Sequence, residues 1–376
     1  MANIMDYLEW RGDLSFEADP FNEIDNLILS QLVYVEFAGI VPGIKEAGSI
    51  TLKAASELFF EKNREEDILA KVSMTKMSAF VMKKAAQTKR FADIKLSRYV
   101  NDIDLKRQSQ FSVLCVGLPD ESIFVAYSGT DSTIVGWREN FNMGYLEETP
   151  GQRKAVNYLN YVMGKNTRTL RIGGHSKGGN LSVFAAVMCE PAIQKHIVAV
   201  YSNDGPGFHK EIIESPQYQK MEPLIRRIVP ESSIVGLLLE HDSRYEVVKS
   251  TEHGVAQHDP MSWEVLGKHF VYGKEVAPES LMLDKTMKNW LEQLNEKQRQ
   301  EIVETAFSVL EEANVHTVDD FYNSKLKKIQ EIIKATSNLP EDTQKLFSRA
   351  VRLLWKSGNE VVKQKVKETM DEKKNS

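Results

Sequence analysis

TLRIGGHSKGGNLSVFAAVM, residues 169–188, has the pattern of a short strand, a glycine-dense turn with one serine, and a helix. Leu170 and Ile172 favour a buried strand before the turn. The apolar residues after the turn recur at helical spacing, namely Leu181, Phe184, Ala185 and Met188. The turn places Ser176 at a helix N-terminus, where N–H groups and the helix dipole favour a negatively charged oxygen. The segment therefore predicts a serine held where an oxyanion could form beside it.

The turn itself matches a short catalytic motif. Gly174, Ser176 and Gly178 fit G-x-S-x-G, the nucleophile elbow of α/β-hydrolases, in which small neighbours let one backbone approach another closely. A glycine-rich strand-to-helix turn with an incidental serine is the alternative. A phosphate-binding loop is disfavoured, because neither G-x-x-x-x-G-K-[ST] nor G-x-G-x-x-G is present.

Composition excludes several classes of protein. The chain has 376 residues, room for a large α/β domain with an accessory region, and a formal net charge of −5, which does not suggest a nucleic-acid partner. Cys115 and Cys189 form no metal-ligand motif, so free thiols in a reducing compartment are expected. The N-terminus lacks the basic cluster and apolar run of a signal peptide. We expect a cytoplasmic protein without nucleic-acid partner, stable membrane insertion, metal or organic cofactor.

The middle of the chain alternates between extended and helical patterns. Apolar, β-branched runs predict strands at 111–117, 123–127, 197–201 and 225–229, the first two forming a hairpin around a Pro-Asp turn. A helix is predicted over 151–163. Such alternation predicts an α/β fold, with a mostly parallel sheet covered by helices on both faces.

Three parts are expected along the chain. Residues 1–104 are predicted to be a helical segment packed on the core, with a cap over the core as one interpretation, and to include an amphipathic helix over 21–34. Residues 105–275 are predicted to form the α/β-hydrolase core, and a further hairpin is expected through 241–248. Residues 276–376 are predicted to be a helical extension.

Four segments together resemble a known family. They are FVAYSGTD (124–131), GGHSKGGN (173–180), VYSNDGPG (200–207) and VAQHDP (255–260). They resemble the Mbeg1-like family of bacterial proteins, which is similar to the class 3 lipases, and the resemblance covers roughly residues 1–270. It implies an α/β-hydrolase fold and the chemistry of a serine esterase or lipase. It does not imply a particular substrate.

The expected order of catalytic residues is serine, acid, histidine, so the base must lie well downstream of Ser176. We favour His258, which lies in a Pro-bounded loop at the position of the family's histidine; His253 is the second choice. A surface or structural role for His258 is the alternative interpretation. His175 is expected to pack beside the elbow rather than to act as base.

The catalytic acid is harder to assign. In class 3 lipases it lies in a segment resembling residues 228–235, where the matching position is Ser233, and a hydroxyl cannot supply the negative charge that stabilises an imidazolium. Asp204, which ends the strand after the nucleophile helix, is the proposed replacement, because neighbouring strands end at the same crevice. An Asx turn before Gly205 is its alternative role. Asp242 is interpreted as a turn former.

The oxyanion hole is predicted to use the backbone N–H of Lys177 and a second donor at Thr130. Class 3 lipases commonly carry an arginine where this chain has Ser128, and often an apolar residue at Lys177. These departures disfavour a triglyceride pocket and leave smaller or more polar esters open. The predicted function is hydrolysis of carboxylic esters through an acyl-serine. The alternatives are a catalytically inactive binding module, favoured by Ser233, and membrane-surface association through the Lys-rich C-terminal end.

Overall fold

The computed structural model describes residues 1–70, 73, 75–104, 109–130, 142–144, 146–240, 244–312 and 344–345. Within them an eight-stranded sheet runs in sequence order from β1 to β8. Its strands are β1 (Ile50–Thr51), β2 (Lys95–Asp104), β3 (Ser109–Gly117), β4 (Ile123–Tyr127), β5 (Leu170–His175), β6 (Ile197–Asn203), β7 (Ile225–Pro230) and β8 (Glu246–Val248). Pairing is antiparallel from β1 to β4 and parallel from β4 to β8.

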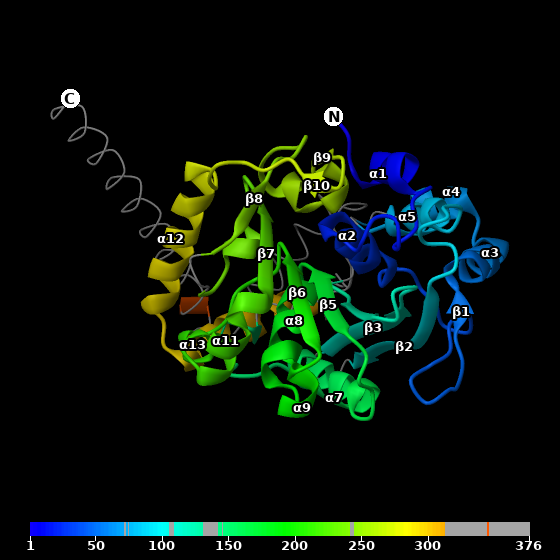
Figure 1. Cartoon of the computed structure of the whole chain (residues 1–376). Coiled ribbons are helices and arrows are strands. Elements are labelled where there is room, and N and C mark those ends of the chain that lie inside the picture. The colour runs from blue at the N-terminus through cyan, green and yellow to red at the C-terminus, as the bar shows by residue number, and fades with distance from the viewer. Residues whose placement is uncertain are drawn as a thin grey trace.

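Helices and short turns connect and flank these strands. The α-helices are α1 (Ile4–Arg11), α2 (Glu23–Leu32), α3 (Leu52–Lys62), α4 (Glu65–Ala70), α5 (Ser78–Ala85), α7 (Pro150–Met163), α8 (Lys177–Met188), α9 (Pro191–Gln194), α10 (Lys210–Ile213), α11 (Pro216–Met221), α12 (Pro278–Glu292) and α13 (Glu296–Glu312). The 3-10 turns are η1 (Glu222–Leu224), η2 (Val235–Leu237), η3 (Gly254–His258) and η4 (Pro260–Ser262), and β9 (Val265–Leu266) pairs with β10 (His269–Phe270). In Figure 1 the sheet lies between α3 (blue) and α12 (yellow).

The two faces of the sheet are covered by different parts of the chain. Side chains alternate between faces along a strand, so Phe124 and Ala126 of β4 join one hydrophobic cluster while Val125 and Tyr127 join the other. The first cluster contains the buried residues of α1, α2, α3 and α5, and the second those of α7 and α8. The N-terminal helices therefore form one covering layer of the sheet. This is the α/β fold predicted from the sequence, with the arrangement of an α/β-hydrolase.

The strand predictions hold in the centre of the sheet and fail at its edges. The hairpin of β3 with β4, the buried strand β6 and strand β7 are confirmed. The section 49–104 was expected to be helical, but β1 and β2 lie in it. β2 is half exposed, mixed in polarity and bulged between Ser97 and Val100, so its sequence lacks the alternation of apolar and polar residues that identifies a strand. Of the hairpin predicted through 241–248, the described strand β8 pairs in parallel with β7. Residues 241–243, with Asp242, lie outside the described residues.

A buried ion pair fixes α2 beneath the sheet. Asn22 caps α2 by accepting N–H bonds from Ile24 and Asp25, and the Asp25 carboxylate accepts the Asn22 N–H in return. Asp25 also accepts from Arg90 Nε at 2.7 Å and Nη2 at 2.5 Å, and from the hydroxyl of Tyr7 at 2.8 Å. Both charged side chains are 0% exposed. The pair therefore locks the N-terminal layer in place with its charges neutralised.

Candidate active site

Ser176 occupies the sharp turn between β5 and α8. Its backbone has φ 58° and ψ −132°, a strained conformation for a residue with a side chain. Gly174 and Gly178 make the turn sterically feasible: a Cβ on Gly174 would lie 2.4 Å from the Gly178 carbonyl carbon, and one on Gly178 would lie 2.1 Å from the Tyr127 oxygen. The Ser176 N–H donates to Asn203 O at 2.9 Å, which ties the turn to β6. The motif thus has the geometry of a nucleophile elbow.

The N-terminal layer reaches the underside of this turn. Asn203 donates from its side chain to Gly174 O at 3.0 Å, and Asn26 of α2 donates to the Asn203 side-chain oxygen at 2.9 Å. A Cβ on Gly173 would lie 2.6 Å from the Asn26 oxygen, so β5 and α2 touch directly. These buried amides satisfy one another, and they hold the elbow from below.

Asp204 and His258 lie side by side at the end of β6. The Asp204 carboxylate oxygen Oδ2 is 2.6 Å from His258 Nδ1, and Asp204 is wholly buried while the His258 side chain is 15% exposed. Asp204 has φ 49°, and its backbone N–H donates to Ile228 O at 2.7 Å. Among the described residues its carboxylate accepts from Ser233 and Gly236 and contacts His258. An Asx turn would need the N–H of residue 206, which is a proline and has none. The structure therefore brings the two residues together across 54 positions of sequence.

Ser233 also contacts this carboxylate, a contact that sequence reasoning missed. Its hydroxyl donates to Asp204 Oδ1 at 2.5 Å, and the Gly236 N–H lies 3.2 Å from the same oxygen. Ser233 occupies the position where the resemblance places an acid, so in this chain the β7 loop supplies hydrogen-bond donors and β6 supplies the carboxylate. That adjacent parallel strands end at one edge of the sheet predicts that the β7 loop lies near Asp204, but it does not predict which group donates.

His175 packs beside His258, with ring centroids 4.6 Å apart. Its Nε2 is 2.8 Å from the His258 carbonyl oxygen, and its Nδ1 is 3.1 Å from the Tyr34 hydroxyl. Burial, with a smaller effect from the charge of His258, holds the pKa of His175 well below its usual value. His253, the second choice for a base, is exposed where η3 begins.

The two expected oxyanion donors belong to segments next to Ser176. Lys177 is the first residue of α8, so its backbone N–H belongs to the helix N-terminus beside the serine. Thr130 follows Gly129, and a Cβ on Gly129 would lie 3.0 Å from Ser176 Cβ. The Lys177 side chain points elsewhere: it is 0% exposed, and its Nζ donates to Gln110 O at 2.6 Å and Gln110 Oε1 at 2.7 Å. Lys177 therefore contributes its backbone here, and its ammonium does not line the crevice.

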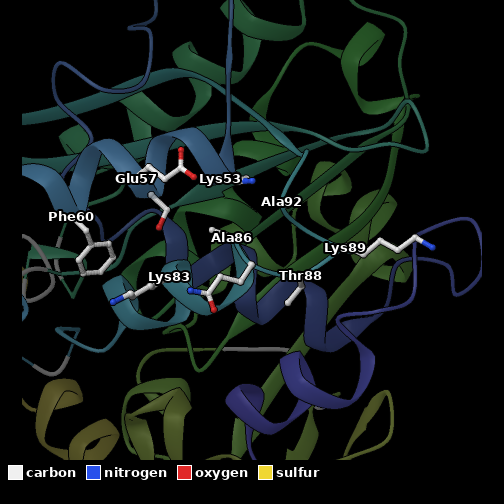
Figure 2. A pocket seen from close by; sticks show the side chains of 10 residues that line it. Lys53, Glu57, Phe60, Lys83, Ala86, Thr88, Lys89 and Ala92 are labelled. Atoms are coloured by element: carbon white, nitrogen blue, oxygen red, sulfur yellow. The ribbon is translucent and has the colours of Figure 1, made fainter.

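A cavity of about 600 Å³ lies elsewhere, between α3 and α5 (Figure 2). Its lining includes Lys53, Glu57, Phe60 and Thr88, and Lys89 extends away from the other labelled side chains. None of the site residues around Ser176 lines it. We therefore assign this cavity no part in the chemistry at Ser176.

The family model described as Mbeg1-like matches residues 85–308, more than half of the chain. The chain belongs to the Mbeg1-like family. Its solved structural neighbours include the Rhizomucor miehei lipase propeptide complex, with 15% identity and a TM-score of 0.32, covering 42% of this chain and 57% of the lipase chain. The M37 lipase has 16% identity and a TM-score of 0.36, covering 56% of this chain and 68% of its own. No curated protein sequence matches the chain.

No helix among the described residues of this Mbeg1-like protein is long and apolar enough to cross a membrane. The Lys-rich C-terminal end, the basis of the predicted association with membrane surfaces, lies outside the described residues.

Proposed function

We propose that this Mbeg1-like protein is a serine hydrolase that cleaves carboxylic esters through an acyl-serine at Ser176. In this proposal His258 is the general base, Asp204 is the acid that orients it, and the backbone N–H groups of Lys177 and Thr130 bind the oxyanion. The observation that carries the proposal is the 2.6 Å contact between buried Asp204 and His258, close to a serine on a strained elbow.

The reaction would proceed in two halves. Ser176 Oγ attacks the ester carbonyl carbon while its proton passes to His258 Nε2, and the carbonyl oxygen becomes an oxyanion. The tetrahedral intermediate then collapses: the ester C–O bond breaks, and the leaving alkoxide takes the proton from His258. Water repeats the sequence on the acyl-serine, releasing the carboxylic acid and restoring Ser176.

Asp204 would fix the tautomer of His258. Because Nδ1 carries the proton that is donated to Asp204 Oδ2, Nε2 is left with the lone pair that accepts the serine proton. The negative charge of Asp204 then stabilises the imidazolium formed during attack. Ser233 and Gly236 hold the other carboxylate oxygen, so the acid cannot rotate away without losing hydrogen bonds.

The substrate is proposed as a carboxylic ester, and no acyl length is assigned. The expectation of small or polar esters depended on Ser128 and Lys177, yet both side chains are buried and turned to other partners: Ser128 Oγ donates to Gly129 O at 3.1 Å, and Lys177 to Gln110. The binding-module alternative depended on the missing acid at Ser233. Asp204 supplies a carboxylate to His258 from the next strand, which supports the hydrolase.

We propose the cytoplasm as the compartment in which this hydrolase works. Cys115 and Cys189 are both free and buried. Burial raises the pKa of Cys115 to about 11 and that of Cys189 to about 12, so both thiols stay protonated and unreactive. Buried free thiols are the usual state of cysteine in a reducing compartment.

The proposal is tested with a panel of p-nitrophenyl esters of increasing acyl length. Ser176→Ala is expected to lower the hydrolysis rate by at least about 10⁴-fold. The matched control is Ser182→Ala on the same helix, whose hydroxyl donates to Gly178 O at 2.7 Å; it should keep the wild-type rate. Folded wild-type protein that hydrolyses no ester, or Ser176→Ala protein that remains active, would refute the proposal.

A further inference from the structure

Tyr34, two residues beyond α2, reaches the site from the N-terminal layer. Its hydroxyl accepts the Gly129 N–H at 3.1 Å, and it lies 3.1 Å from His175 Nδ1 and 3.2 Å from His175 O. Gly129 immediately precedes Thr130, the proposed oxyanion donor. One phenol oxygen from outside the hydrolase motifs therefore contacts both the oxyanion segment and the elbow.

His175 extends this contact to the loop that carries His258. The His258 carbonyl can only accept, so His175 Nε2 must carry the proton that it donates over 2.8 Å. In the neutral ring Nδ1 is then an acceptor, so the one proton of the Tyr34 hydroxyl is shared between Nδ1 and the His175 carbonyl oxygen. Because burial lowers the pKa of His175, this neutral form is the one that the site holds.

We propose that Tyr34 and His175 are positioning residues that set the distance between the oxyanion segment and His258. The connection runs from Gly129 N–H to the Tyr34 hydroxyl, through the His175 ring, to the His258 carbonyl. This inference rests on the proposed function, because it concerns the alignment of the same reacting groups. Neither residue contacts the reacting atoms in this role.

The expected effect follows from how sharply catalysis depends on geometry. A misplacement of about 1 Å between reacting groups can cost about 10²-fold in rate. Tyr34→Phe removes one oxygen and leaves the Gly129 N–H and His175 Nδ1 without this partner, while it keeps the ring. We expect the rate at which a fluorophosphonate labels Ser176 to fall by about tenfold or more.

The matched control is Tyr158→Phe. Tyr158 is buried on α7 and donates its hydroxyl to Arg98 O at 2.8 Å, on the sheet edge and apart from Ser176. It loses the same atom as Tyr34→Phe and should label at the wild-type rate. Equal labelling rates in wild-type protein and Tyr34→Phe would overturn the inference.

Two substitutions at His175 separate positioning from simple packing. A glutamine can still donate to the His258 carbonyl, whereas alanine cannot, so His175→Gln should recover most of the rate that His175→Ala loses. Because the connection passes through both residues, Tyr34→Phe combined with His175→Ala should lose less rate than the product of the two single losses. Some additional loss beyond that of His175→Ala is expected, because Tyr34 also contacts the Gly129 N–H and the His175 backbone oxygen. Equal rates for the glutamine and alanine variants, or fully additive losses, would contradict the proposal.

The outcomes keep this inference apart from the proposed function. If wild-type protein is not labelled at all, ester hydrolysis at Ser176 fails and the inference fails with it. If wild-type protein is labelled and Tyr34→Phe, His175→Gln and His175→Ala are labelled at the same rate, the hydrolase proposal stands and only the positioning role is refuted. Thermal melting of each variant, set beside that of Tyr158→Phe, shows that the rates compare folded proteins.

Discussion

Two wholly buried aspartates in this protein have opposite kinds of partner. Asp25, beneath the sheet, is paired with the guanidinium of Arg90, which is always charged, and with the hydroxyl of Tyr7. Asp204, at the carboxyl edge of the sheet, is bonded to the neutral groups of Ser233 and Gly236 and to His258. The first carboxylate has a permanent counter-charge. The second faces a ring that can gain its charge during a reaction.

The difference separates a structural carboxylate from the one proposed to be catalytic. A permanent ion pair holds two elements together, but it does not stabilise a further charge, because its own charges are already balanced. A carboxylate held by neutral donors can instead stabilise a charge that appears on histidine only in the transition state. Burial alone does not distinguish the two residues. The chemical kind of the partner does: a guanidinium in one case and an imidazole in the other.

The largest expected effect concerns Asp204. Asp204→Asn keeps the shape of the side chain but removes its charge and permits the wrong tautomer of His258, so the rate of ester hydrolysis should fall by about 10⁴-fold. Steady-state kinetics on a p-nitrophenyl ester measure this. Asp25→Asn is the paired substitution and should leave the rate per folded molecule unchanged. A similar loss of rate in both variants would remove the distinction.

The next largest effect concerns the pair of Asp25 with Arg90, and it is an effect on the stability of the fold. Arg90→Met leaves Asp25 buried without its counter-charge, which should cost about 3–5 kcal/mol in the free energy of unfolding. Urea denaturation followed by circular dichroism measures it. At the candidate site, Asp204→Asn removes the carboxylate charge itself. It should lower the free energy of unfolding by less, because no permanent charge is left unpaired. An Arg90→Met protein as stable as wild type would contradict the structural role of the pair.

A smaller effect is expected at Ser233, which donates a hydrogen bond to Asp204. Ser233→Ala removes one of the two donors to Asp204 Oδ1 and leaves the Gly236 N–H, so the hydrolysis rate should fall by about tenfold, the worth of one hydrogen bond to a charged group. The control is Ser232→Ala at the adjacent position. If kcat/KM is the same in both variants, the clamp on Asp204 does not contribute to the reaction.

The smallest effect concerns pH and His175. Since its pKa is lowered by burial and by His258, the unfolded chain binds a proton below about pH 6.5 that the folded chain does not, so stability falls as the pH falls through that value. Between pH 7.5 and pH 5.5 the wild type should lose about 1 kcal/mol more than His175→Gln. Urea midpoints at the two pH values measure the difference, and equal losses would exclude a neutral His175.

The spacing of apolar residues and glycines predicted the central strands of the sheet better than the strands near its edges. The elbow around Ser176 could be recognised because a strand, a glycine turn and a helix are each encoded within a few residues. β2 was missed because a bulged, half-exposed strand lacks the alternation that identifies strands. The boundary expected at 104 cuts between β2 and β3, which pair in one sheet. The extent of the core therefore remains a proposal.

The contacts around Asp204 needed the three-dimensional structure. The sequence allowed two roles for Asp204, because a turn before Gly205 accounts nearly as well for an aspartate at that position. That Ser233 donates to Asp204 depends on how the ends of β6 and β7 are aligned, which no local pattern records. Tyr34 was missed for the same reason: it lies 141 residues from His175.

The most direct test of a triad of Ser176, His258 and Asp204 is the intact mass of the protein after treatment with a fluorophosphonate. We expect wild-type protein to gain one phosphonyl group as fluoride leaves, peptide mapping to locate it on Ser176, and Asp204→Asn to gain it far more slowly. Ser176→Ala should gain nothing. Folded wild-type protein that keeps its original mass, or a label on another residue, would contradict the assignment of Ser176, His258 and Asp204 as a catalytic triad.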